Sequence, residues 1–191
     1  MKLKALALAL VLTGFGAVQA SAQNFHLGLE AGANFDNFIG TDVSASSLTS
    51  SRLGLVGGAY LTLQFGSSFA IQPEVLYAQK GGQDTASNTY QLDYIEIPVL
   101  FKLSLGTPIV NPGLLLGPTF NMNILAKVVN GGASSDITNV NQTDIGVMGG
   151  VVVDIDKFSV SGRYELGLTD ITTASKVQNG TITVLVGYSF M

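Results

Sequence analysis

The stretch Asn24–Phe35, NFHLGLEAGANF, decides the fold because it alternates between two kinds of residue without an error. Its odd-numbered positions, from Phe25 to Phe35, are all apolar, whereas its even-numbered positions are polar or glycine. Successive side chains of a β-strand point to opposite faces. The stretch therefore predicts a strand with one apolar face and one polar face.

The same alternation recurs along the rest of the chain. We expect further strands at residues 52–65, 69–80, 94–105, 112–123, 144–155, 158–169 and 183–191, which makes eight in all. The last segment, TVLVGYSFM, keeps Val184, Val186, Tyr188 and Phe190 on one face. These lengths match the roughly 9 to 11 residues with which a tilted strand crosses a bilayer.

The connections between these segments alternate between short and long. Short turns are expected at residues 66–68, 106–108 and 156–157, and long polar loops at residues 36–50, 81–89, 124–142 and 172–180. Strands that run up and down between a short-turn side and a long-loop side form an up-and-down antiparallel sheet.

Pro98 and Pro118 fall inside two of the expected strands. Because proline has no N–H to donate to a neighbouring strand, we expect a bulge or irregular pairing at each.

The composition indicates that the sheet lies in a membrane. Apolar residues make up 47% of the chain and charged residues 12%, which is about half the usual charged share of a soluble domain. An open sheet edge in lipid would leave backbone groups without hydrogen bonds, so the sheet must close. The sequence predicts an all-β protein, an eight-stranded up-and-down antiparallel transmembrane β-barrel of the cell outer membrane, with lipid as its surroundings.

The chain begins like an exported protein. Met1–Lys4 is basic, residues 5–18 are almost wholly apolar, and Ala20–Ala22 is a small-residue cleavage site. We expect a signal peptide at 1–22 and a barrel domain at 23–191; the alternative, an uncleaved anchor, needs about 20 apolar residues. Loss of Lys2 and Lys4 takes the net charge from −4 to −6. An acidic chain without a basic cluster does not fit a nucleic-acid partner.

Several charged residues occupy the polar faces of the expected strands. They are Glu30, Arg52, Glu74, Lys80, Glu96, Lys102, Asp144, Asp154, Arg163 and Glu165. The interior of an eight-stranded barrel is just wide enough for its own side chains, so we expect a network in which each charge has a partner. Glu96 and Glu165 are the expected partners of Lys102 and Arg163; a polar pathway or ligand site is the alternative.

No catalytic, metal-binding or cofactor-binding residues are expected. The chain has no cysteine and a single histidine, His26, to which no serine and aspartate can be assigned. Glycines of the polar faces, such as Gly54 and Gly146, precede no helix and do not match a phosphate-binding loop.

Three stretches resemble a known family: Gln72–Gly82 (QPEVLYAQKGG), Tyr94–Lys102 (YIEIPVLFK) and Gly162–Thr169 (GRYELGLT). They are similar to the PorT-like outer-membrane β-barrel domain of Gram-negative bacteria, over the whole chain after the signal peptide. The resemblance implies eight strands and makes Pro98 part of the family pattern. It also implies a C-terminal signal, Tyr188 and Phe190, for the barrel-assembly machinery, from which the final Met191 departs.

We expect a structural or surface-interaction barrel without catalysis, with any extracellular ligand bound through the loops, of which residues 124–142 are the longest. A transport or secretion-accessory barrel of the PorT-like kind is the alternative. The third interpretation is a soluble secreted β-barrel that binds an apolar ligand.

Overall fold

The computed structural model describes residues 24–39, 48–84, 88–106, 109–130, 133–137, 141–169 and 178–190, which form nine β-strands. The strands are β1 Asn24–Ile39, β2 Leu48–Phe65, β3 Phe69–Asp84, β4 Thr89–Ser104, β5 Val110–Asn130, β6 Ala133–Asp136, β7 Thr143–Ile155, β8 Phe158–Gly167 and β9 Gln178–Ser189. The expected signal peptide, residues 1–22, lies outside the described residues. Among those described, no helix is long and apolar enough to span a membrane.

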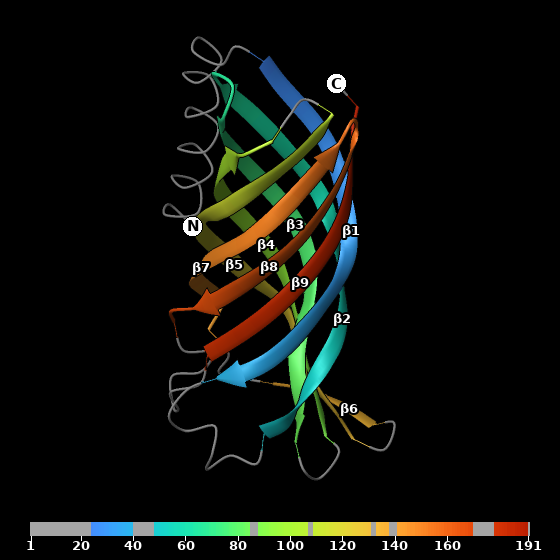
Figure 1. Cartoon of the computed structure of the whole chain (residues 1–191). Coiled ribbons are helices and arrows are strands. Elements are labelled where there is room, and N and C mark those ends of the chain that lie inside the picture. The colour runs from blue at the N-terminus through green and yellow to red at the C-terminus, as the bar shows by residue number, and fades with distance from the viewer. Residues whose placement is uncertain are drawn as a thin grey trace.

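Eight of the described strands close into a barrel (Figure 1). All neighbours are antiparallel, and the ring is completed by β4 with β5 and by β1 with β9. β6 is not part of the ring, since it pairs only with the end of β5, at the opposite end of the barrel from the C-terminus. The eight-stranded up-and-down barrel predicted from the sequence is confirmed.

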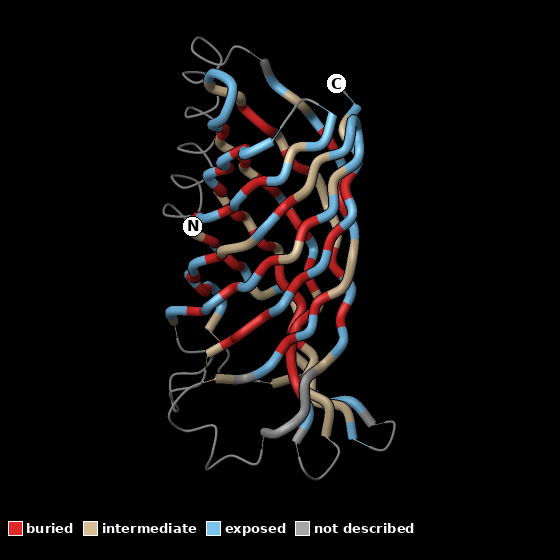
Figure 2. Tube along the Cα trace, viewed as in Figure 1, coloured by how far each residue is buried: buried red, intermediate tan, exposed pale blue. Residues whose placement is uncertain are grey.

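Buried and more exposed residues alternate along much of the ring of strands (Figure 2). On β9, for example, Val184 is 45% exposed, whereas Thr183 and Leu185 on either side of it are 5% and 1% exposed. The exposed set is apolar and the buried set is largely polar. A soluble barrel would have the opposite arrangement, so the interpretation as a soluble carrier of an apolar ligand is wrong.

Aromatic rings gather at the short-turn end of the barrel. The centroid of Tyr188 lies 5.1 Å from that of Phe158 and 5.5 Å from that of Phe190, and Phe65 and Phe69 lie 6.2 Å apart. Aromatic girdles of this kind lie where a barrel meets the membrane interface. The last two aromatic residues therefore belong to the girdle, and their role as an assembly signal stays a prediction.

The strands at the other end run further than expected. β1 continues to Ile39 and β5 to Asn130, and β3 and β4 fill most of the expected loop 81–89. The sequence predicts that these strands end where polar residues become frequent. Outside the lipid the outward face of a strand meets water instead of hydrocarbon, so the apolar signal ends there while the backbone pairing continues.

The prolines do not produce bulges. Pro98 pairs with Thr119, and Pro118 with Val147, without a shift of register. The pairs between β3 and β4 do pass from Pro73–Val99 to Leu76–Glu96 with none between them. Irregular pairing is therefore present beside Pro98, since proline has no N–H to donate there. The register is the same on either side of this gap.

A charged residue placed on the outward face of a strand tests whether that face contacts lipid. Val184→Arg places a guanidinium near the middle of the apolar band and should lower the free energy of unfolding in lipid vesicles by about 2 to 4 kcal/mol. The matched change Val110→Arg, at the first residue of β5, should cost about 1 kcal/mol or less. Equal losses in chemical unfolding would contradict the assignment of this face to lipid.

Candidate functional site

Arg163 of β8 is the centre of a buried ion cluster inside the barrel. Its guanidinium donates to both carboxylate oxygens of Glu30 on β1, at 3.2 and 2.9 Å, and to Glu74 on β3, at 2.7 Å. All three side chains are at most 2% exposed. In the ring of strands β8 and β3 are four steps apart in either direction, so this cluster joins opposite walls.

The second cluster is built around Lys80 of β3. Its ammonium lies 2.5 Å from Glu165 on β8 and 2.5 Å from Glu96 on β4. Glu165 also accepts hydrogen bonds from Thr119 at 2.7 Å and Asn121 at 2.6 Å, both on β5. This cluster again joins β3 to β8, and the two clusters together place ion pairs across the lumen.

A separate ion pair, outside the two clusters, lies towards the short turns. Lys102 of β4 is 2.7 Å from Asp154 of β7, and the two side chains are 11% and 23% exposed. The pair is therefore partly hydrated, unlike the ion pairs of the two clusters.

Apolar side chains occupy some of the other inward positions. They form two buried groups, Val56 with Leu76, Ala78 and Leu185, and Leu100 with Leu115, Met148 and Val152. Charged layers and apolar groups therefore share the lumen, as expected for a barrel whose interior its own side chains fill.

The expected inward residues are brought together, but with different partners. Arg163 and Lys102 both pair with carboxylates, yet neither pairs with Glu96 or Glu165, which both contact Lys80. The expected partners were wrong because strand tilt and stagger determine which inward residues share a height in a barrel. Alternation within a strand contains no information on stagger.

Two expected members of the network have no ion pair within the described part of the chain. Arg52 donates to the backbone oxygen of Lys80, and Asp144 accepts a hydrogen bond from the hydroxyl of Thr169.

Sequence reasoning missed several buried polar residues near the long-loop end. Asp36, which was assigned to a loop, is fully buried and accepts hydrogen bonds from Thr181 and, at 2.6 Å, from the N–H of Gly81. Asn179, also assigned to a loop, is 1% exposed. The even-number periodicity of β1 continues to Asp36, and following it further would have found this residue.

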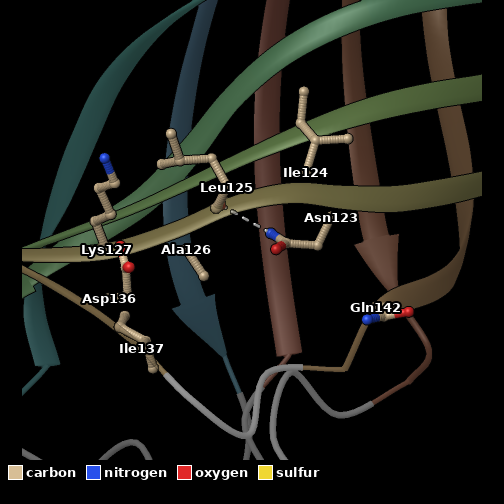
Figure 3. A pocket seen from close by; sticks show the side chains of 8 residues that line it. All are labelled: Asn123, Ile124, Leu125, Ala126, Lys127, Asp136, Ile137 and Gln142. Carbon is tan, nitrogen blue, oxygen red and sulfur yellow. Dashed lines mark hydrogen bonds between the residues drawn. The ribbon is translucent and has the colours of Figure 1, made fainter.

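A pocket of about 490 Å³ lies at the long-loop end, where β5 separates from β7 (Figure 3). The N–H of Asn123 donates to Gln142 at 2.9 Å, and the N–H of Ile137 to Ala126 at 3.0 Å. The pocket lies between these two backbone hydrogen bonds, beside residues 123–126 of β5. Polar residues Asn123, Lys127, Asp136 and Gln142 line the pocket together with Ile124, Leu125, Ala126 and Ile137. A ligand could enter it from outside.

His26 lies on β1 at the short-turn end, paired in register with Thr62 of β2. No group of three or more histidine, cysteine, aspartate or glutamate side chains that could hold a metal occurs among the residues described.

Removal of the Arg163 side chain tests how strongly the barrel depends on its ion clusters. Arg163→Met leaves Glu30 and Glu74 buried beside each other, and we expect a loss of about 3 to 5 kcal/mol in the free energy of unfolding. Lys102→Met should cost less than Arg163→Met, because water reaches part of the Asp154 carboxylate that it leaves without a partner. Chemical unfolding in detergent measures both variants.

The triple variant Arg163→Met with Glu30→Gln and Glu74→Gln should recover most of that loss, since no uncompensated charge remains. A triple variant that is no more stable than Arg163→Met would show that the charges are not the cause.

The comparisons with known proteins agree with this architecture. The model of the outer membrane protein beta-barrel domain family matches residues 19–173. No match is found among curated protein sequences. Among solved structures, Neisserial surface protein A is 17% identical with a TM-score of 0.59, covering 88% of this chain and 100% of its own.

Two further structures share the fold. Ail, the attachment invasion locus protein of Yersinia pestis, is 14% identical with a TM-score of 0.51, covering 88% of this chain and 100% of its own. The outer membrane enzyme PagL is 9% identical with a TM-score of 0.53, covering 83% and 98%. The chain belongs to the outer membrane protein beta-barrel domain family and is located in the outer membrane.

Proposed function

We propose that the protein is a non-catalytic barrel that presents an interaction surface at its long-loop end. The observation that carries the proposal is the pair of ion clusters across the lumen, in which Arg163 and Lys80 each join β3 to β8. A lumen occupied in this way has little room for a passing solute. The exposed long-loop end of the barrel is then the region through which the protein can interact with other molecules.

At the long-loop end, strands extend beyond the part of the barrel that carries the exposed apolar residues. Ile124 is the last exposed large apolar residue of β5, and the strand continues to Asn130 before β6 returns beside it. Long loops of outer-membrane barrels face the outside of the cell. The end of β5, β6 and the pocket beside them therefore supply the proposed surface.

The absence of catalysis is part of this proposal. PagL has the same fold and is an enzyme by its title, so the fold does not decide the question. What supports the proposal is the position of His26, the only histidine of the sequence, at the end of the barrel opposite the proposed surface.

The chemistry of the partner differs from that of one relative. Ail has been crystallised with a heparin analogue, sucrose octasulfate. The present chain has a net charge of −4, which disfavours a polyanion. A neutral or basic partner fits better.

We further propose, on the three resembling stretches, that the chain belongs to the PorT-like branch of barrels. The role in secretion is not transferred with it. A transport or secretion-accessory function is the second candidate, and the filled lumen counts against its transport form.

Solute flux separates the two candidates. Liposomes that contain the folded protein should swell in small sugars no faster than empty liposomes, because the ion clusters block the lumen. A porin reconstituted in parallel is the positive control. Swelling above the empty-liposome rate would favour transport.

Deletion of residues 130–139 tests the rim. The variant should keep its heat-dependent mobility shift on gels, since the ring of eight described strands does not include β6. It should reduce adhesion of expressing cells to immobilised neutral and basic proteins to the level of cells without the barrel. Ser67→Ala with Ser68→Ala, at a short turn, is the control and should adhere like wild type. Unchanged adhesion after the deletion would contradict the proposed surface.

A further inference from the structure

We propose that the pocket beside β5 binds the headgroup of a membrane phospholipid that carries both a primary ammonium and a phosphate, as phosphatidylethanolamine does. The pocket has a volume of about 490 Å³ and is lined by residues of β5, of the end of β6 and of the segment just before β7. This site goes beyond the proposed interaction surface, because its ligand is a lipid of the surrounding membrane and not a partner from outside the cell.

The pocket lies where the apolar outer face of the barrel ends. Phe120, Met122 and Ile124 form an exposed apolar track along β5, and Ile124 also lines the pocket. Among the described residues of β5, no large apolar side chain beyond Ile124 is exposed. Because the long loops of outer-membrane barrels face the outside of the cell, the pocket lies at the level of the outer-leaflet headgroups.

Two opposite charges at this pocket lack partners. Lys127 of β5 and Asp136 of β6 both line it and are direct cross-strand partners, so their side chains share one face of the sheet. Within the described part of the chain, neither side chain has an ion pair or a hydrogen bond. Figure 3 shows Lys127 and Asp136 at one side of the pocket and the carboxamide of Gln142 at the other.

These groups fit a ligand that carries charges of both signs. A phosphate would accept hydrogen bonds from the Lys127 ammonium and the Gln142 carboxamide, and a primary ammonium would donate to the Asp136 carboxylate. A purely anionic headgroup would instead meet the charge of Asp136, and a purely cationic one that of Lys127. Because like charges repel, the pocket favours a zwitterion over either.

The apolar part of the lining favours a lipid over a soluble zwitterion. Half of the residues that line the pocket are apolar, namely Ile124, Leu125, Ala126 and Ile137. Alkyl groups that cover these side chains remove apolar surface from water. The exposed track on β5 continues from Ile124 towards the middle of the membrane. A headgroup with acyl chains along this track contacts both surfaces, whereas a free zwitterion contacts the pocket alone.

Lipid retention by the full folded barrel tests the proposal. Protein extracted from the outer-membrane fraction is freed of lipid in detergent. It is then mixed with equal amounts of phosphatidylethanolamine, phosphatidylglycerol and phosphatidylcholine of the same acyl chains, and bound lipid is counted by native mass spectrometry.

We expect phosphatidylethanolamine to be retained about fivefold more than phosphatidylglycerol, which lacks the ammonium, since an ion pair in contact with water contributes about this factor. Phosphatidylcholine should also be retained less, because its quaternary ammonium has no N–H to donate. Free phosphoethanolamine at the concentration of the lipids should leave this preference unchanged. Its loss would show that a soluble zwitterion is the ligand and would overturn the lipid assignment.

The double variant Lys127→Gln with Asp136→Asn should lose the preference for phosphatidylethanolamine while the gel-mobility shift shows a folded barrel. If it does not fold, Asp136→Asn alone serves, and it should lower retention of phosphatidylethanolamine to that of phosphatidylglycerol. The matched control is Asp156→Asn with Lys157→Gln, which removes one charge of each sign at a short turn and should behave like wild type. Asparagine tolerates the positive φ of 53° at residue 156.

Three results would overturn the proposal. They are equal retention of the three lipids by wild type, no retained lipid at all, and an unchanged preference in the variants of Lys127 and Asp136. The last result would mean that these two charges are ordinary solvated surface residues.

Discussion

The backbone hydrogen bond in lipid is the constraint on which this structure depends. Hydrocarbon offers no partner to an exposed N–H or C=O, so a sheet that crosses the membrane must have no free edge. Pairing of β1 with β9 supplies the last row of bonds, and even Phe190, just beyond β9, donates its N–H to Leu27 of β1 at 2.8 Å. The apolar outward faces and the polar interior follow from this closure. The outer side of a closed sheet faces hydrocarbon, whereas the inner side faces the lumen and is shielded from lipid.

The interior then poses a second physical problem. An eight-stranded barrel encloses its inward side chains tightly, so each charge that enters must find a partner there. Arg163 and Lys80 meet this requirement by contacting two carboxylates each, which leaves carboxylates in excess over cations inside the barrel. Contact with the membrane thus determines which residues lie on the outside of the barrel, whereas short-range charge pairing determines how the inward residues are arranged.

The wall could be predicted from the sequence and the lumen only in part. Alternation in segments such as Asn24–Phe35 gave strand positions and the direction of each face, since both depend on neighbours along the chain. Which charges meet depends on stagger between strands, and Lys80 was therefore not recognised as the partner of Glu96 and Glu165. Asp36 could have been found by following the alternation of β1 one residue further, to the position after Phe35. Asn179 could not, because polar residues occupy both faces near the loops and alternation gives no signal that one of them is buried.

The position of the cluster residues along the chain has a consequence for the order of assembly. Glu30, Glu74, Lys80 and Glu96 lie on β1, β3 and β4, whereas Arg163 and Glu165, which complete their clusters, lie on the next-to-last strand. A chain that enters the membrane from its N-terminus holds Glu30 and Glu74 without their guanidinium until β8 arrives. Dehydration of the interior before that moment would leave two carboxylates without a counter-charge. The interior must therefore stay wet until the final hairpin is in place, which couples the drying of the barrel to the completion of its wall.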